Sequence, residues 1–236
     1  MTEAEWLAAT EPRGVLESWS QPTSERKMRL FCCACCRRIW QLITAPESRK
    51  AVEVSEALAD GRAREGRRAA ANLAATAVAR RERSWPFAAA EEASKRLIRA
   101  YRKSPALATW AARTAYYAYE AAYLGTYYAV GTNDRAAFDS GNVARQAEQA
   151  AQIALLRDIF GNPFRPVPFS PSWRTDTVLA LARRVYESRD FSAMPILADA
   201  LQDAGCDSPD VLAHCRDPQG THVRGCWVVD LLLEKE

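Results

Sequence analysis

The residues best suited to chemistry lie close together near the carboxyl end of the chain. Both histidines of the protein, His214 and His222, fall between Cys206 and Cys226. Imidazole nitrogen and thiolate sulfur are ligands that zinc prefers in proteins, and four of them complete a tetrahedral shell. We therefore predict a zinc site formed by Cys206, His214, His222 and Cys226, with Cys215 as a substitute ligand.

The spacing of these residues leaves a second interpretation open. They lack the two-residue gap that pairs two ligands in a zinc knuckle. Cysteine is also among the residue types most often buried, so buried thiols beside a locally hydrogen-bonded histidine account for the same residues without a metal. Convergence of the two imidazole rings with the thiols on one point would favour the metal.

An enzymatic pocket near Asp199, His222 and Arg224 is a further alternative, because acidic residues recur in this part of the chain. Acids at helical spacing are also typical of a solvated helix face. The chain contains no nucleophile elbow, no phosphate-binding glycine loop and no His-Glu-x-x-His motif. The sequence therefore favours a protein that is not an enzyme, and it assigns no catalytic residue.

A second group of cysteines, Cys32, Cys33, Cys35 and Cys36, lies in the middle of an expected helix. At 100° per residue the four thiols cover an arc of about 160°, which a core-facing side of the helix explains. Redox-active thiols usually lie at a helix N-terminus after a strand, where the helix dipole lowers their pKa. We therefore expect buried, reduced thiols here.

Arginines form the one basic concentration in the chain, although the formal net charge is only +3. Such side chains can contact the phosphates of a nucleic acid. The segment lacks interleaved aromatic residues for base stacking and any helix-turn-helix pattern, which favours a solvated helix face. Nucleic-acid binding stays an alternative, and it would use Arg62, Arg64, Arg67, Arg68, Arg80, Arg81 and Arg83.

Hydrophobic spacing, capping residues and prolines together predict an all-α protein. Thr2 and Glu5 form a capping box, Ser24 can cap a helix that reaches Thr44, and Pro46 suits the first turn of the next helix. A later helix should contain Leu97, Ile98 and Tyr101, and Asp134 should cap the longest one. The other expected helices are 62–83, 105–130, 134–159, 175–188, 194–204, 209–216 and 226–234.

Four prolines between 163 and 171 exclude a helix there and indicate a linker. The predicted fold is therefore a multi-helix orthogonal bundle with a short-helix C-terminal part after a proline-rich linker. Residues 1–160 should form the long-helix bundle with the cysteine-rich second helix, and 161–174 the linker. Residues 175–236 should form a short-helix C-terminal subdomain that packs on the bundle.

The composition indicates a cytoplasmic globular protein without a membrane segment. Hydrophobic residues make up 48% of the chain and charged residues 26%, which is ordinary for globular proteins. Residues 1–6 carry acids where a secretory signal needs basic residues, and no run of about 18 apolar residues follows anywhere. Seven cysteines, an odd number, do not suggest a secreted disulfide framework.

Four segments carry a resemblance, namely 5–7, 29–40, 156–166 and 222–230. Together they resemble an expanded, Gemmata-type family of uncharacterised planctomycete proteins, over about the first quarter and the last third of the chain. Residues 195–205 are similar to the core of short modules in planctomycete multidomain proteins. This similarity favours an interaction or regulatory role. Because the sequence combines many packing residues with no catalytic constellation, we predict a soluble helical protein-interaction or regulatory module with an unidentified protein partner.

Overall fold

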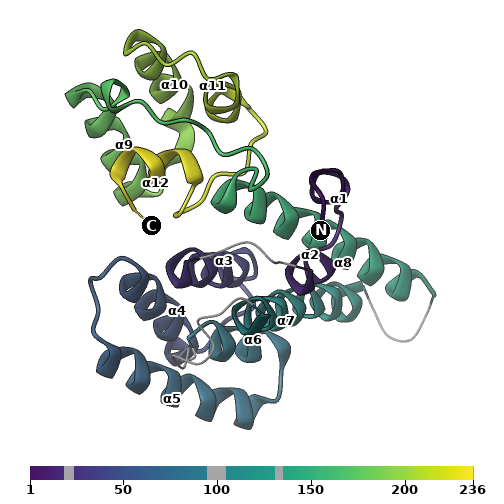
Figure 1. Cartoon of the computed structure of the whole chain (residues 1–236). Coiled ribbons are helices and arrows are strands. Elements are labelled where there is room, and N and C mark those ends of the chain that lie inside the picture. Colours follow the sequence, from purple (N-terminus) through teal and green to yellow (C-terminus); the bar gives the residue numbers. More distant parts are fainter. Residues whose placement is uncertain (19–23, 95–104, 131–134, 236) are drawn as a thin grey trace. The chain divides into compact units, whose positions relative to one another are not determined.

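The computed structural model describes residues 1–18, 24–94, 105–130 and 135–235. These residues form twelve α-helices and no strand, which confirms the predicted all-α fold (Figure 1). Two short 3-10 helices, η2 (Pro171–Trp173) and η3 (Phe191–Ala193), lie near the start of the C-terminal part. The α-helices are α1 (Glu3–Ala8), α2 (Pro12–Glu17), α3 (Glu25–Arg38), α4 (Pro46–Ala59), α5 (Glu65–Glu82), α6 (Trp85–Ala93), α7 (Pro105–Val130), α8 (Arg135–Phe160), α9 (Asp176–Ser188), α10 (Met194–Asp203), α11 (Pro209–Arg216) and α12 (Trp227–Leu233).

The chain divides into two compact units, Met1–Ile153 and Ala154–Glu236. We expected the first part to continue to residue 160, where the proline-rich segment begins. The division falls earlier because α8 is one continuous helix whose last residues group with the C-terminal unit. The end of helix α8, at Phe160, and the boundary between the two units, after Ile153, are therefore at different positions in the chain.

The cysteine-rich helix α3 is the centre of the N-terminal unit, where it packs against α4, α6 and α7. Cys32, Cys33, Cys35 and Cys36 are all fully or almost fully buried and carry free thiols. Burial raises the pKa of each of these thiols, to about 12 for Cys33. Such thiols stay protonated, as the core-facing interpretation predicts.

The end of α3 differs from the prediction. The Ser24 hydroxyl accepts a hydrogen bond from the Lys27 amide at 3.1 Å, so the helix begins as expected. It ends at Arg38 and not at Thr44. The Arg49 side chain of α4 donates to the carbonyl oxygens of residues 40 and 43. Since those carbonyls follow the last helical residue, side-chain donors hold the turn that replaces the expected helical continuation.

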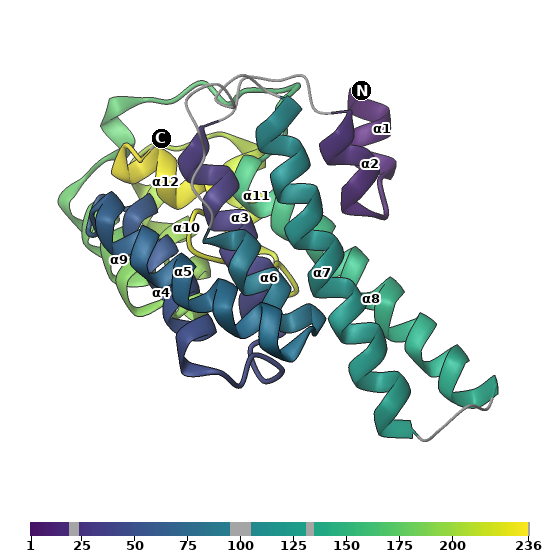
Figure 2. The same ribbon diagram turned by 90° about the horizontal axis from the view of Figure 1, so that it is seen from below.

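Within the N-terminal unit, α7 and the first part of α8 run side by side in opposite directions (Figure 2). The Arg145 guanidinium of α8 donates to Glu120 of α7 at 3.0 Å and lies 4.2 Å from the ring centre of Tyr123. A charge-assisted hydrogen bond and a cation–π contact from one side chain thus join the two helices.

The C-terminal unit has a hydrophobic core of its own, formed by α9 to α12. Thr175 caps α9 by accepting from the Val178 amide at 3.3 Å, and Ser208 caps α11. The Arg174 guanidinium donates to the Leu232 carbonyl at 3.0 Å, which ties the start of α9 to the end of α12. The fully buried residues of this core include Val178, Ala182, Val185, Leu197, Ala198, Leu201, Cys215, Cys226 and Val229.

Substitutions of two neighbouring residues of α10 test the assignment of this core. Leu197 is fully buried, whereas 59% of the adjacent Ile196 is exposed. We expect Leu197→Ala to lower the free energy of unfolding of the C-terminal unit by about 2–5 kcal/mol, because it removes buried methyl groups and leaves a cavity. Ile196→Ala should change it by less than about 0.5 kcal/mol. Hydrogen exchange of the α9 and α10 amides measures both changes in the free energy of unfolding. Equal losses of stability in the two variants would contradict the assignment of Leu197 to the core and Ile196 to the surface.

Two predicted features fall outside the described residues: the helix containing Leu97, Ile98 and Tyr101, and the Asp134 cap. None of the helices that the structure does describe combines the length and apolar character needed to cross a bilayer.

Candidate metal centre

Four side chains that can bind a metal meet within the C-terminal unit. Asp158 lies in the last turn of α8, His214 in the last turn of α11, and His222 in the loop after it. Cys226 is the residue directly before α12. One ligand atom from each, a carboxylate oxygen, two imidazole nitrogens and a sulfur, lies within 4.8 Å of all the others.

The distances place one nitrogen of each imidazole beside both the carboxylate and the thiol. His214 Nε2 lies 3.2 Å from Asp158 Oδ1 and 3.2 Å from Cys226 Sγ. His222 Nδ1 lies 3.1 Å from the same Asp158 oxygen and 4.0 Å from the sulfur. The four atoms therefore surround a common point.

These separations fit the edges of a zinc tetrahedron. Ordinary zinc–ligand bond lengths imply about 3.4 Å between nitrogen and oxygen ligands and about 3.6 Å between nitrogen and sulfur. The four distances above lie within about 0.5 Å of those values. Shifts of the ligand atoms by about half an ångström or less would bring these four pairs to the separations found in a zinc site.

The same geometry does not suit a catalytic triad. In a Cys-His-Asp triad the thiol and the carboxylate contact opposite nitrogens of one imidazole, so that the acid orients the base. Here Asp158 and Cys226 both approach Nε2 of His214. Groups that converge on one side of a ring can share a cation, but they cannot relay a proton through the ring.

Burial makes a cation favourable at this point. Asp158 and Cys226 are 2% and 0% exposed. Burial raises the pKa of the Cys226 thiol well above its usual range, and the Asp158 charge adds to this effect. Burial would also raise the pKa of Asp158, but hydrogen bonds from His214 and His222 outweigh it and leave that pKa below its usual range. A buried carboxylate thus needs positive charge beside it.

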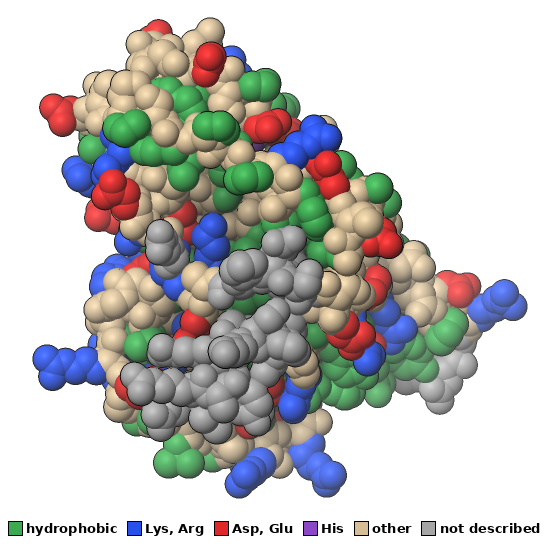
Figure 3. Space-filling view, viewed as in Figure 1, with side chains coloured by type: hydrophobic (Ala, Val, Ile, Leu, Met, Phe, Trp, Pro, Cys, Tyr) green, Lys and Arg blue, Asp and Glu red, His purple; other side chains and the backbone are tan. Residues whose placement is uncertain are grey.

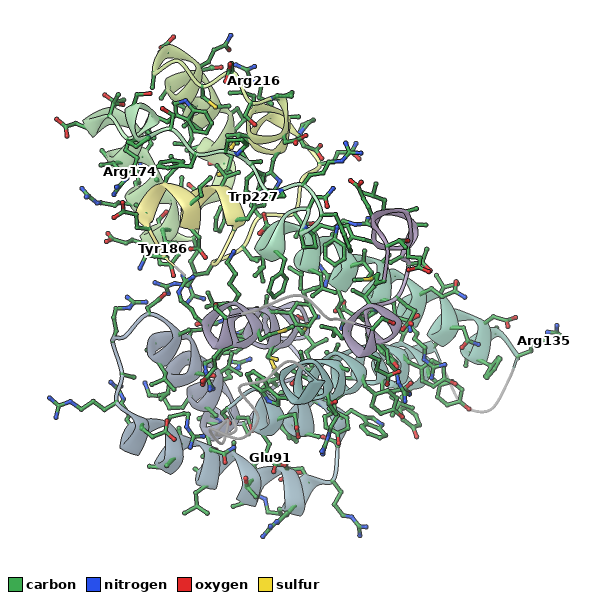
Figure 4. All side chains as sticks on the ribbon, in the orientation of Figure 1. Glu91, Arg135, Arg174, Tyr186, Arg216 and Trp227 are labelled. Atoms are coloured by element: carbon green, nitrogen blue, oxygen red, sulfur yellow. The ribbon has the colours of Figure 1, made fainter. Side chains whose placement is uncertain are left out.

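Surrounding groups hold the ligands in place. The Val223 amide donates to the second carboxylate oxygen of Asp158 at 2.8 Å, which leaves Oδ1 facing the histidines. The Phe191 ring stacks on His222 with ring centres 6.1 Å apart. Trp227, labelled in Figure 4, follows Cys226 directly, and its ring lies 5.3 Å from that of His214. Such outer contacts fix the orientation of metal ligands.

Local turns bring His222 and Cys226 together. Asp217 accepts from the Gln219 and Gly220 amides, which turns the chain after α11. A Cβ atom at Gly220 would lie 3.0 Å from His222 Nε2, so a glycine leaves room for the ring. Gly225 has a φ of 98°, a conformation that favours glycine, and it precedes Cys226.

The structure brings together three of the four residues that the sequence predicted as zinc ligands. His214, His222 and Cys226 converge, the fourth group at this point is Asp158, and Cys206 is not among the four. Cys206 and Cys215 are buried in the hydrophobic core, and burial raises the pKa of both thiols, to about 12 for Cys215. They correspond to the packing interpretation of cysteine.

One signal in the sequence could have indicated Asp158. Leu155, Leu156 and Ile159 are almost completely buried, so residue 158 lies among core-facing positions of α8. A carboxylate at such a position requires a polar or charged partner. The sequence alone did not show which of the distant histidines supplied it.

The residues of the suggested enzymatic pocket have different partners. Asp199 accepts from Arg216, at the end of α11, at 2.9 Å on the exposed surface, and Arg224 lies 4.7 Å from the ring centre of Tyr186. His222 belongs to the cluster with Asp158. Tyr186 and Arg216 are labelled in Figure 4. The pocket stays a prediction.

The arginine-rich segment forms α5 and its two flanks. Arg68 is 3% exposed; it pairs with Glu65 at 2.9 Å and donates to the Ser94 carbonyl, so it is part of the fold. The other six arginines are exposed. Figure 3 shows basic side chains projecting singly from the surface formed by α5, with neutral surface between them. Nucleic-acid binding through this segment stays a prediction.

Comparisons of the chain with protein-family models, with curated proteins and with solved structures each give no match. The resemblance to planctomycete proteins therefore stays a prediction as well.

Proposed function

We propose that this protein binds one zinc ion through Asp158, His214, His222 and Cys226, and that the ion has a structural role in the C-terminal unit. The observation that carries the proposal is convergence. Each imidazole turns a single nitrogen toward the same carboxylate oxygen and the same sulfur, at 3.1 to 4.0 Å. Four donors facing one buried point is the arrangement that a tetrahedral cation needs.

The ligand types support zinc over other cations. Calcium and magnesium take six or more oxygen ligands, and this cluster offers one carboxylate. Two imidazole nitrogens with one thiolate suit zinc or its spectroscopic substitute cobalt. The cluster carries two potential negative charges, on Asp158 and Cys226, which match the charge of a divalent ion.

A structural role follows from the number and burial of the ligands. Catalytic zinc sites keep a position open for water, whereas structural sites use four protein ligands. The His214 side chain, 19% exposed, is the most accessible of the four, followed by His222 at 7% and Asp158 at 1%, and Cys226 is completely buried. The cluster thus offers a closed set of ligands with little access for a substrate.

Elemental analysis of the full chain, purified without chelators, tests this proposal. We expect about one equivalent of zinc for each chain, since structural sites bind tightly enough to survive purification. A zinc content below about a tenth of an equivalent, after incubation with zinc and removal of the excess, would contradict the proposal.

Cobalt substitution gives a second readout of the same site. Tetrahedral Co²⁺ absorbs visible light strongly, and a thiolate ligand adds a charge-transfer band in the near ultraviolet. We expect both signals, and zinc should displace them. A spectrum of octahedral Co²⁺ would show that the four side chains do not act as one ligand set.

A further inference from the structure

The proposed ligands come from two distant parts of the C-terminal unit. Asp158 belongs to α8 and precedes the proline-rich segment. His222 lies after that segment, 64 positions beyond Asp158 in the chain. The other two ligands also lie after that segment. A bound ion would therefore join the last turn of α8 to the loop between α11 and α12.

Among the described residues, the buried cluster of the α9–α12 bundle is formed without a residue of α8. Its buried cluster runs from Trp173 to Val178 and on to Leu232, and Val167 and Phe169 of the proline-rich segment pack against it. The tie between Arg174 and Leu232 closes the bundle from within. This bundle should therefore keep its fold when the metal is removed.

The last turn of α8 contacts the bundle at the metal cluster. The Asp158 carboxylate contacts His214 and His222 and accepts from the Val223 amide. Beside it, the Gly161 backbone lies against the Trp227 ring, where a Cβ atom would come within 3.2 Å. The groups that contact Asp158 thus surround the proposed ion, and Trp227 directly follows the ligand Cys226.

Without a cation, this junction is held less firmly. The buried Asp158 carboxylate then keeps its contacts with the two imidazoles and the Val223 amide, but no ion bonds to all four ligand groups at once. A divalent ion satisfies the carboxylate, both rings and the thiolate together. Metal occupancy thus changes the strength of this junction far more than that of the aliphatic core.

We propose that the metal acts as a clasp, which fastens the last turn of α8 to the α9–α12 bundle and releases it when the ion leaves. This inference rests on the proposed zinc site. The state of the clasp sets how firmly the last turn of α8, which ends at Phe160, is attached to this bundle. The supply of metal thereby becomes a regulator of the protein.

Hydrogen exchange of the full chain, measured with bound zinc and after chelation, tests the clasp. We expect the amides of residues 155–160 and of Val223 to exchange at least about 10-fold faster after zinc is removed, because local opening then costs less free energy. The amides of α9 and α10 should change by less than about 2-fold. Zinc content is determined in the same samples.

Each other outcome has a distinct meaning. A loss of protection throughout α9 and α10 would show that zinc folds the whole bundle, and unchanged exchange at 155–160 would show that zinc does not hold α8. Either result overturns the clasp while the zinc site stands. A sample that takes up no zinc overturns the proposed function, and the clasp with it.

Asp158→Ala provides a variant that separates the two proposals. Three ligands remain, so the variant should still take up zinc when the metal is in excess, but the link to α8 is lost. We expect fast exchange at 155–160 with and without zinc. Asp199→Ala, an exposed acid of the same unit, serves as the matched control and should behave as the unmodified chain. Zinc-dependent protection of 155–160 in Asp158→Ala would overturn the clasp.

Discussion

Cys226→Ala should lose the bound zinc, whereas Cys206→Ala should retain about one equivalent for each chain. Both cysteines are buried, and both were predicted from the sequence as ligands. Only Cys226 brings its sulfur to 3.2 Å from an imidazole nitrogen of the cluster. Removing the single thiolate takes away the most polarisable ligand and one of the two negative charges.

Zinc analysis after gel filtration, together with the thiolate band of the cobalt form, measures this difference. Cys226→Ser keeps the volume of the side chain and should also lose the band, which separates the loss of a ligand from the loss of packing. Zinc retained by Cys226→Ala, or lost by Cys206→Ala while the helical content is unchanged, would contradict the ligand assignment.

Asp158→Asn should weaken zinc binding by about 100-fold or more. Replacing groups that merely support a metal ligand costs about 10- to 100-fold in affinity, and the loss of a charged ligand exceeds that. The amide oxygen can still accept from the Val223 amide, so the local fold should persist. The substitution thus removes charge from the site with little change of shape.

Competition with a chromophoric chelator measures the affinity of this variant. Asp199→Asn is the control, because Asp199 is an exposed acid whose carboxylate pairs with Arg216. Its affinity for zinc should equal that of the unmodified chain. If Asp158→Asn binds zinc as tightly as this control, the Asp158 carboxylate is not a ligand and the zinc site has only three protein ligands.

The helices were predictable where local signals determine them. The Thr2 capping box, the Thr175 cap and the prolines at 46, 105 and 209 all begin helices in the structure. These signals act within one turn and depend on no distant contact. The end of α3 was missed because Arg49, from the next helix, supplies the donors for the turn after it.

The candidate site was predictable only in part, for a related reason. His214, His222 and Cys226 lie within a short stretch, so their types and spacing suggest a common site. Asp158 lies far from them in the chain and reaches them through the fold of the whole C-terminal unit. Cys206 is close in sequence, but it follows α10 and packs into the core. Chain proximity thus grouped Cys206 with the two histidines, although it lies outside the cluster, and gave no indication of Asp158.

An interaction or regulatory role stays a prediction, and the clasp gives it a physical form. A structural ion that fastens one helix to a small bundle would make access to the part of the bundle that this helix contacts depend on metal. A partner protein that binds this part should then bind the zinc-loaded and the chelated chain with different affinities.

X-ray absorption at the zinc edge of the metal-loaded full chain tests the proposed zinc centre. We expect one sulfur at about 2.3 Å and three nitrogen or oxygen neighbours at about 2.0–2.1 Å, with the outer-shell scattering of two imidazoles. Two or more sulfur neighbours would return Cys206 or Cys215 to the site. A shell of six oxygen neighbours without sulfur would contradict the proposed centre altogether.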